Sequence, residues 1–175
     1  ASDIGCQNAV TAGYRVLARG GSAVDAVEAA VRVLENDPTF DAGYGSVLTA
    51  DQGIEMDAII MDGKDLKVGA VAACTSVRNP ISLAKRIKDK TSHTLIVGAG
   101  ADKIARKFGI EEVGVKDLVT KAAQDEWKQF AASESGDAAY GNTVHTLFNT
   151  GQPNASATAA ATAAVSSECD GDKFG

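Results

Sequence analysis

The stretch from Gly20 to Gly63 constrains the fold most, because it runs from a helical pattern through a glycine-rich turn into an extended segment without a break. Residues 22–34 carry apolar side chains at three-to-four spacing, which predicts an amphipathic helix. Ser22 followed by Asp25 is a variant of the capping box, in which the serine oxygen accepts a backbone N–H and the carboxylate lies near the positive helix end. We expect the helix to begin near Ser22 and to end before Pro38.

A second helical pattern precedes Gly20-Gly21, and the two patterns predict a helical hairpin. Its apolar residues at three-to-four spacing are Cys6, Val10, Tyr14 and Leu17. The three cysteines lack C-x-x-C spacing, so the sequence indicates neither a zinc site nor a disulfide framework, and a reducing compartment fits best. Cys6 and Cys74 lie on apolar patterns, and we interpret both as buried core thiols.

Extended segments follow the glycine-rich turn. Residues 46–49 and 54–61 flank a turn at 50–53, which predicts a β-hairpin, and residues 67–73 predict a further strand. Asn79-Pro80 predicts a helix start, with asparagine as the cap and proline at the first helical position. The later elements are a helix that turns Ile81, Ala84 and Ile87 inward, a strand at 94–97, a short helix stopped by Gly109, and an amphipathic helix carrying Val119, Ala123, Trp127 and Phe130.

The composition is that of a globular domain: 175 residues, of which 45% are apolar and 23% charged. No apolar run approaches the ~18 residues of a membrane span, so we expect no membrane partner. The net charge of -6, without a basic stripe, makes nucleic acid an unexpected partner. Helical spacing fades after residue 131, and residues 155–167 are small and almost uncharged. We therefore predict one domain over residues 1–130 and a flexible tail over 131–175.

Few residues outside one loop suggest chemistry. His93 and His145 sit in no recognisable constellation, and a lone G-x-G at 98–100 is a poor dinucleotide fingerprint. The loop LENDPTFDAGYG places acidic residues and carbonyls between a helix end and a glycine turn, so it could hold a hard cation or be a plain solvated connection. Glu55 and Asp57 are two residues apart on an expected strand, and we interpret them as structural support rather than a catalytic pair.

Several motifs together resemble one family. GGSAVDAVEAAV, the loop, EMDAIIMDG, GAVAA and NPISLAK are similar to the α-subunit region of plant-type asparaginases, also called isoaspartyl peptidases. The resemblance extends from Gly20 to about Gly109 and is loose beyond. Asp41 replaces the first asparagine of the family pattern Asn-Ala-Gly-x-Gly-Ser, and Ile59 replaces the usual serine of E-M-D-A-S-I-M-D-G. The family's first strand and its nucleophile-bearing subunit are not in this chain.

The resemblance implies an α+β fold, the four-layer αββα sandwich of the N-terminal-nucleophile (Ntn) hydrolases, to which this chain contributes the α-subunit part. Such enzymes are cut from one precursor, and a threonine that opens the β subunit is the nucleophile. The implied partners are that β subunit, in an (αβ)2 assembly, and a small amide or β-aspartyl dipeptide substrate. We expect the chain alone to be inactive, and Gly175 to precede the cleaved bond.

The resemblance also implies site residues. The residue at Asp41 helps to orient the threonine, and a carboxylate there, which only accepts hydrogen bonds when ionised, could weaken activity or shift its pH dependence. A structural sodium ion is implied in the loop, held mostly by backbone carbonyls at Leu34, Glu35, Asp37, Phe40, Ala42 and Tyr44. No catalytic cofactor is implied.

Other interpretations stay open. A glycosylasparaginase is the closest alternative, to which HTLIVG at 93–98 leans slightly, and a threonine endoprotease of the same fold is another. A non-catalytic homologue is a third, because of Asp41 and Ile59. The opening ASDIGCQNAV has no signal-peptide character, so we expect a cytoplasmic location, with a lysosomal or secreted one as the alternative.

Overall fold

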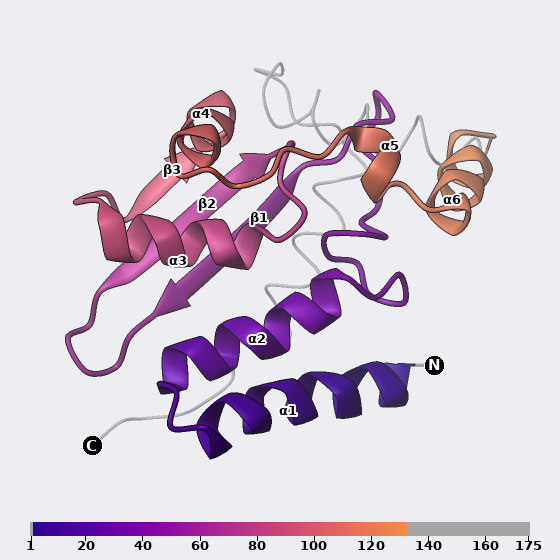
Figure 1. Cartoon of the computed structure of the whole chain (residues 1–175). Coiled ribbons are helices and arrows are strands. Elements are labelled where there is room, and N and C mark those ends of the chain that lie inside the picture. Colours follow the sequence, from indigo (N-terminus) through magenta and orange to yellow (C-terminus); the bar gives the residue numbers. More distant parts are fainter. Residues whose placement is uncertain (1, 133–175) are drawn as a thin grey trace, which may run out of the picture. The chain divides into compact units, whose positions relative to one another are not determined.

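The computed structural model describes residues 2–132, of which the part within Ala1–Lys128 packs as one compact unit (Figure 1). The elements are α1 (Ser2–Ala18), α2 (Ala23–Glu35), β1 (Met56–Met61), β2 (Val68–Cys74), α3 (Pro80–Lys90), β3 (Leu95–Val97), α4 (Ala99–Lys107), α5 (Val115–Leu118) and α6 (Lys121–Ala132). The predicted tail at 131–175 lies almost wholly outside the described residues. The helices and the three-stranded sheet confirm an α+β fold with a small sheet.

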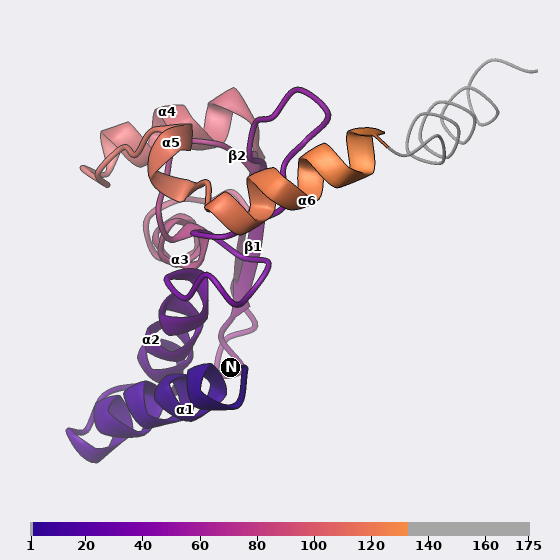
Figure 2. The same ribbon diagram turned by 90° about the vertical axis from the view of Figure 1, so that its right-hand side faces the viewer.

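The first two helices form the predicted hairpin and lie side by side in Figures 1 and 2. The capping box of α2 is present: the Asp25 N–H donates to Ser22 Oγ at 3.1 Å, and the Ser22 N–H donates to the Asp25 carboxylate at 3.3 Å. The buried residues of α1 are small, namely Gly5, Ala9 and Gly13. A Cβ at Gly13 would come within 3.1 Å of the Ala26 carbonyl oxygen, so glycine lets the two helices approach closely.

The large apolar side chains of α1 lie on its open side. Val10 is 71% exposed, Tyr14 68% and Leu17 51%. Cys6 is exposed as well, so the prediction of a buried Cys6 thiol is wrong, because α2 packs on the small-residue face of α1 instead. The prediction for Cys74 is confirmed, since this residue is fully buried and burial raises the pKa of its thiol to about 12.

The sheet has the order β1-β2-β3, with β1 antiparallel and β3 parallel to β2. Ile59 pairs with Ala70, and Val71 pairs with Ile96. The predicted hairpin between residues 46–49 and β1 is wrong, because residues 46–49 form no strand and β1 pairs with β2. Backbone groups around 46–49 bond elsewhere: the Gly45 N–H donates to the Leu118 carbonyl at 3.0 Å, and Trp127 Nε1 donates to the Thr49 carbonyl at 3.1 Å.

Helix α3 covers one face of the sheet, which Figure 2 shows nearly edge-on. Ile81, Ala84 and Ile87 are at most 3% exposed, which confirms that they face inward. A Cβ at Gly69 would come within 2.2 Å of the Ala84 carbonyl oxygen, so a glycine in β2 allows this close contact. The opposite face keeps four large apolar side chains between 52% and 68% exposed: Ile59, Met61, Leu95 and Val97.

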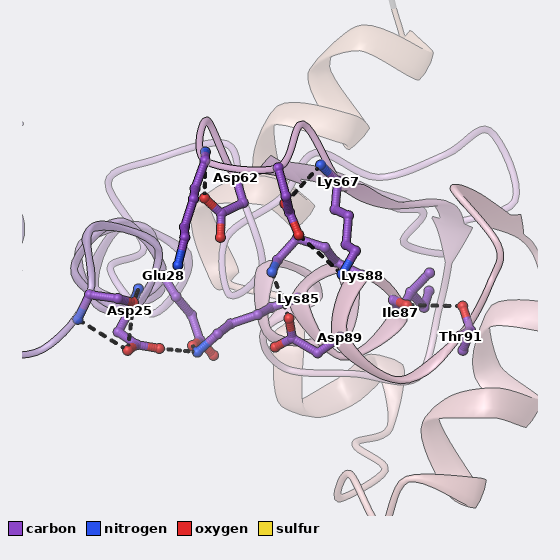
Figure 3. Close-up of polar contacts among 12 residues, drawn as sticks. Asp25, Glu28, Asp62, Lys67, Lys85, Ile87, Lys88, Asp89 and Thr91 are labelled. Carbon is purple, nitrogen blue, oxygen red and sulfur yellow. Dashed lines mark hydrogen bonds and ion pairs between the residues drawn. The ribbon is translucent and has the colours of Figure 1, made fainter.

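An ion-pair cluster joins α2 to α3 away from the sheet. Figure 3 shows Lys85 of α3 reaching the carboxylates of Asp25 and Glu28 on α2. The Lys85 ammonium lies 2.8 Å from Glu28 and is also paired with Asp25. Ser82 donates a hydrogen bond to Glu28 at 2.6 Å. The polar faces of the two helices are therefore held together by charge as well as packing.

Helix α4 contacts β2 and β3, and Leu118 of α5 belongs to the hydrophobic core. Gly109, at φ +68, follows α4 as predicted. The expected amphipathic helix is present as α6, but Val119 lies before it and Phe130 is 53% exposed, so the predicted apolar face is confirmed only in part, by Ala123 at 6%. Within residues 2–132, every helix falls short of the length and apolar character that a bilayer crossing needs.

Candidate active site

A pocket of about 280 Å³ lies where α2 ends and β1 and α3 begin. It is lined by Glu35, Asp41, Ala42, Gly43, Ser46, Val47, Glu55, Met56, Asp57 and Pro80. The lining contains four carboxylates and no basic residue, so the local potential is negative. The fold thus places the loop after α2 and the EMD segment, residues 55–57, around one cavity.

The turn between Asp41 and Ser46 is shaped by two glycines. Gly43 has φ +59 and Gly45 has φ +111, both in the region that favours glycine. A Cβ at Gly43 would stand 2.4 Å from the Glu35 carbonyl oxygen, so this position has no room for a side chain. The Tyr44 N–H donates to that same carbonyl at 2.8 Å. The turn is therefore packed and bonded directly against the last residue of α2.

Asp41 is exposed and lines the pocket from this turn. Its Oδ1 accepts the Val47 N–H at 2.9 Å, while its other oxygen has no hydrogen-bond partner among the described residues. An asparagine could accept the same N–H through its oxygen and would also present an NH₂ donor to the pocket. Aspartate therefore keeps the turn but replaces a donor with an acceptor. Its role in orienting a nucleophile stays a prediction.

Glu35 is 3% exposed, and its carboxylate bridges the end of α2 to the start of α3. Oε1 accepts the Ile81 N–H at 2.9 Å, and Oε2 accepts from the Asn79 side-chain amide at 3.0 Å. Burial raises the pKa of this carboxyl to about 7, because these neutral donors offset only part of the desolvation of the charge. The sequence suggested Glu35 only as a carbonyl ligand, since its side-chain partners lie 44 and 46 residues away.

The start of α3 corrects one detail of the predicted cap. Asn79 is the N-cap residue and Pro80 is the first helical residue, as expected, but the Asn79 side chain makes no capping bond. Its amide donates to Glu35 instead, and the Glu35 carboxylate accepts the free N–H of Ile81. A buried acid from α2 thus replaces the local cap. The α3 N-terminus favours its negative charge, but burial outweighs this attraction and disfavours the charge overall.

Asp57 and Glu55 differ in their surroundings. Asp57 Oδ1 accepts the Ala73 N–H at 2.7 Å, which supports the interpretation of this carboxylate as structural. Ala73 has φ +49, and the β1–β2 register shifts between Met56 and Ala58, so Asp57 satisfies the backbone at an irregularity of the sheet. Glu55 precedes β1, is exposed, and accepts no hydrogen bond from the described part of the chain.

The six carbonyls expected to hold sodium lie in and before this turn. Those of Leu34, Glu35 and Asp37 already accept backbone N–H groups, from Asp37, Tyr44 and Phe40 respectively. The carbonyls of Phe40, Ala42 and Tyr44 receive no hydrogen bond within residues 2–132. Hard oxygen donors with open lone pairs are what an alkali or alkaline-earth cation requires, so the donor set fits such an ion. The sodium site stays a prediction.

Other residues considered from the sequence lie elsewhere. Asp37 accepts the Thr39 N–H at 2.9 Å and the Thr39 hydroxyl at 2.5 Å, and these bonds lower the pKa of its carboxyl. His93 is exposed beyond the end of α3, and Ile59 is exposed on the uncovered sheet face. Gly175 and His145 lie outside the described residues. In the described range, no three His, Cys, Asp or Glu side chains gather as a metal site.

The sequence of this chain is similar to those of known proteins. A family model described as asparaginase matches residues 2–171. An isoaspartyl peptidase/L-asparaginase of Mus musculus is 56% identical over 117 residues, 67% of this chain and 36% of that protein. A plant-type L-asparaginase of Thermococcus kodakarensis is 51% identical over 125 residues, 71% of this chain and 40% of that protein. An isoaspartyl peptidase/L-asparaginase of Danio rerio is 46% identical over 128 residues, which are 73% of this chain and 41% of that protein.

The chain therefore belongs to the asparaginase family, and the resemblance inferred from its motifs is confirmed. It spans well under half the length of these relatives, with 36–41% of each protein aligned. The residues that the family model matches include the loop and the pocket described above, while most of each relative has no counterpart in this chain.

Proposed function

We propose that this chain is the α-subunit part of an autoprocessed hydrolase that cleaves the side-chain amide of L-asparagine and β-aspartyl (isoaspartyl) peptide bonds. The nucleophile would be an N-terminal threonine on a companion β subunit, released by cleavage after Gly175. The observation that carries the proposal is the pocket formed by the glycine turn and the EMD segment, with Asp41 on its wall, in a chain similar to proteins named for these activities.

The proposed reaction has two stages. The free amine of the threonine takes the proton of its own hydroxyl, whose oxygen attacks the amide or isopeptide carbonyl and expels ammonia or the peptide amine. Water then attacks the acyl-enzyme ester, releases the acid and restores the threonine. Backbone and side-chain donors stabilise the oxyanion in both stages.

Asp41 would act at the nucleophile through its hydrogen bonding. One of its oxygens is held by the Val47 N–H, so the other can accept from a hydroxyl or an ammonium placed in the pocket. It cannot donate to an oxyanion or hydroxyl oxygen as an asparagine could. A slower enzyme than its asparagine-bearing relatives is therefore expected, and a non-catalytic homologue is the alternative that Asp41 favours.

A structural sodium ion would be held by the carbonyls at Leu34, Glu35, Asp37, Phe40, Ala42 and Tyr44. When bound, the ion would supply positive charge that fixes the loop and would take no part in bond cleavage. The three carbonyls without hydrogen bonds in the described residues support this assignment. No catalytic cofactor is proposed.

The uncovered sheet face supports the four-layer αββα sandwich. One face is packed under α3, while Ile59, Met61, Leu95 and Val97 leave the other face apolar and exposed. A face of this kind packs stably on a second sheet about 10 Å away. We propose that the β subunit supplies that sheet, that two αβ units form an (αβ)2 assembly, and that neither nucleic acid nor membrane is a partner. We propose the cytoplasm as the compartment.

Intact-mass spectrometry of the complete gene product tests the central step. The expected result is a second polypeptide that begins with threonine, together with a first one that ends at Gly175. The purified pair should then hydrolyse asparagine and β-aspartyl dipeptides. A single uncleaved, folded polypeptide without either activity would contradict the proposal and favour the non-catalytic alternative.

A further inference from the structure

We propose that the Glu35 side chain is a positioning residue, which ties the turn carrying Asp41 to the start of α3 and so sets the geometry of the pocket. The inference concerns the side chain of Glu35, whereas the expected cation ligand is its backbone carbonyl. It rests on the proposed function for its kinetic consequence, but not for its structural one.

Both oxygens of the buried Glu35 carboxylate accept hydrogen bonds from the start of α3. Oε1 accepts the Ile81 N–H at 2.9 Å and Oε2 accepts the Asn79 amide at 3.0 Å, while the residue is 3% exposed. Burying a carboxylate without a cation at hydrogen-bond distance is costly, so these two bonds are needed to keep it in place. The side chain is therefore held in one orientation relative to α3.

The backbone of the same residue holds the turn. The Glu35 carbonyl accepts the Tyr44 N–H at 2.8 Å, and Gly43 packs so closely that a Cβ would lie 2.4 Å from that oxygen. The same Cβ would lie 3.1 Å from the Arg78 carbonyl oxygen, just before the start of α3. The turn is thus confined between the end of α2 and the residues that precede α3, and Glu35 joins the two.

The contacts of Glu35 with the turn and with α3 lie at the pocket. Glu35, Asp41 and Pro80 all line the cavity, one from each of the three segments that Glu35 connects. Asp41 is in turn bonded to the Val47 N–H at 2.9 Å, across the turn that Tyr44 anchors. Loss of the Glu35 carboxylate would therefore let the turn move relative to α3 and would displace Asp41, because both Glu35 oxygens are bonded to the start of α3.

The experiment compares Glu35→Ala, Glu35→Gln and a matched control, Glu28→Gln, in the complete gene product. Glu28 lies on the same helix but pairs with Lys85 and Ser82, away from the pocket. Two quantities are measured for each protein: amide hydrogen exchange in residues 41–47, and kcat and KM for asparagine and a β-aspartyl dipeptide per folded, processed site.

For Glu35→Ala we expect exchange in residues 41–47 to rise about tenfold or more, because two buried donors lose their acceptor. We expect kcat to fall by about 100-fold, as for a displacement on the order of 1 Å, with KM changed much less. Glu35→Gln should retain both properties, since its oxygen can accept the Ile81 N–H and the Asn79 amide can turn to accept from its NH₂. Glu28→Gln should resemble the wild type in both.

Two results would overturn the proposal: an unchanged exchange rate in residues 41–47 of Glu35→Ala, or the same loosening in Glu28→Gln. If Glu35→Ala does not fold, Glu35→Asp replaces it with the same expectations, because its shorter side chain keeps the charge but cannot reach both donors. A wild type without hydrolase activity would defeat the proposed function, and hydrogen exchange alone would then decide the role of Glu35.

Discussion

The two ends of α2 carry acidic residues with opposite electrostatic behaviour. At its first turn, the hydrogen bond from Lys85, with those from Ser22, lowers the pKa of Asp25 to about 2. At its last residue, burial raises the pKa of Glu35 to about 7. Asp25 has a half-exposed side chain and a cationic partner, whereas Glu35 is 3% exposed and is bonded only by neutral donors.

The opposite pKa shifts of Asp25 and Glu35 indicate different roles for the two ends of α2. The Asp25 end is a stable, solvated connection to α3 that favours the charged carboxylate, as surface ion pairs do. The Glu35 end is electrostatically unfavourable for the same group, yet it lies on the pocket and joins three segments of the chain. Costly burial of a charge at a cavity is typical of a functional site, which supports the role proposed for Glu35.

The largest effect on stability is expected from Glu35→Ala. It leaves the Ile81 N–H and the Asn79 amide buried without their acceptor, so the free energy of unfolding should fall by about 2–5 kcal/mol. Urea unfolding of the complete protein measures this change. Glu35→Gln is the control and should lose much less, and an equal loss in both variants would show that the charge, not the hydrogen bonds, matters.

Gly43→Ala alters the close contact between the turn and the Glu35 backbone. The residue has φ +59, which costs a side chain about 1–2 kcal/mol, and the new Cβ would overlap the Glu35 carbonyl. We expect a total loss of about 2–3 kcal/mol by urea unfolding. Gly63→Ala is the matched control, because no atom lies within 4 Å of its Cβ position. Similar losses in the two variants would argue against a specific contact at Gly43.

The pH dependence of stability should separate the two ends of α2. The folded pKa of Glu35 is about 7 against 4.5 for an unperturbed glutamate, so its contribution to stability falls as the pH rises from about 4.5 through 7. That of Asp25 is present above about 3.8 and is lost as the pH falls toward 2. Urea unfolding across pH 4–8 should show a decline in the wild type that is smaller in Glu35→Gln. Parallel profiles would contradict the raised pKa.

Lys85→Met should have the smallest effect, because the cluster that it breaks is partly exposed. The loss should be about 1 kcal/mol or less, and it should shrink at high salt. The pKa of Asp25, followed by NMR, should rise but stay below its ordinary value, since the Ser22 hydrogen bonds remain. A pKa that does not move would show that Ser22, and not Lys85, is the main cause of the shift.

Much of the local structure could be predicted from the sequence. The Ser22–Asp25 cap, Pro80 at the first turn of α3 and the inward face of that helix depend on residues three or four positions apart. Several local motifs together were enough to indicate the family, and the pattern of the glycine turn marked Asp41 as a site residue.

The errors have a common cause. Residues 46–49 have the composition of a strand but do not pair with β1. The N–H of the preceding Gly45 donates to the Leu118 carbonyl, and the Thr49 carbonyl accepts from Trp127 Nε1. Cys6 has the spacing of a core residue, but α2 packs on the adjacent small-residue face. In both cases the partner is chosen by competition among distant segments, which a local pattern does not contain.

The sequence by itself thus determined where α2 and α3 begin, which family the chain belongs to and which turn is chemically distinctive, because these depend on neighbours along the chain. Only the tertiary structure decided which strands pair, which face of α1 is buried and what the Glu35 carboxylate does. Its partners at Asn79 and Ile81 are distant in sequence, and the free energy of burying a charge depends on what the folded chain brings around it.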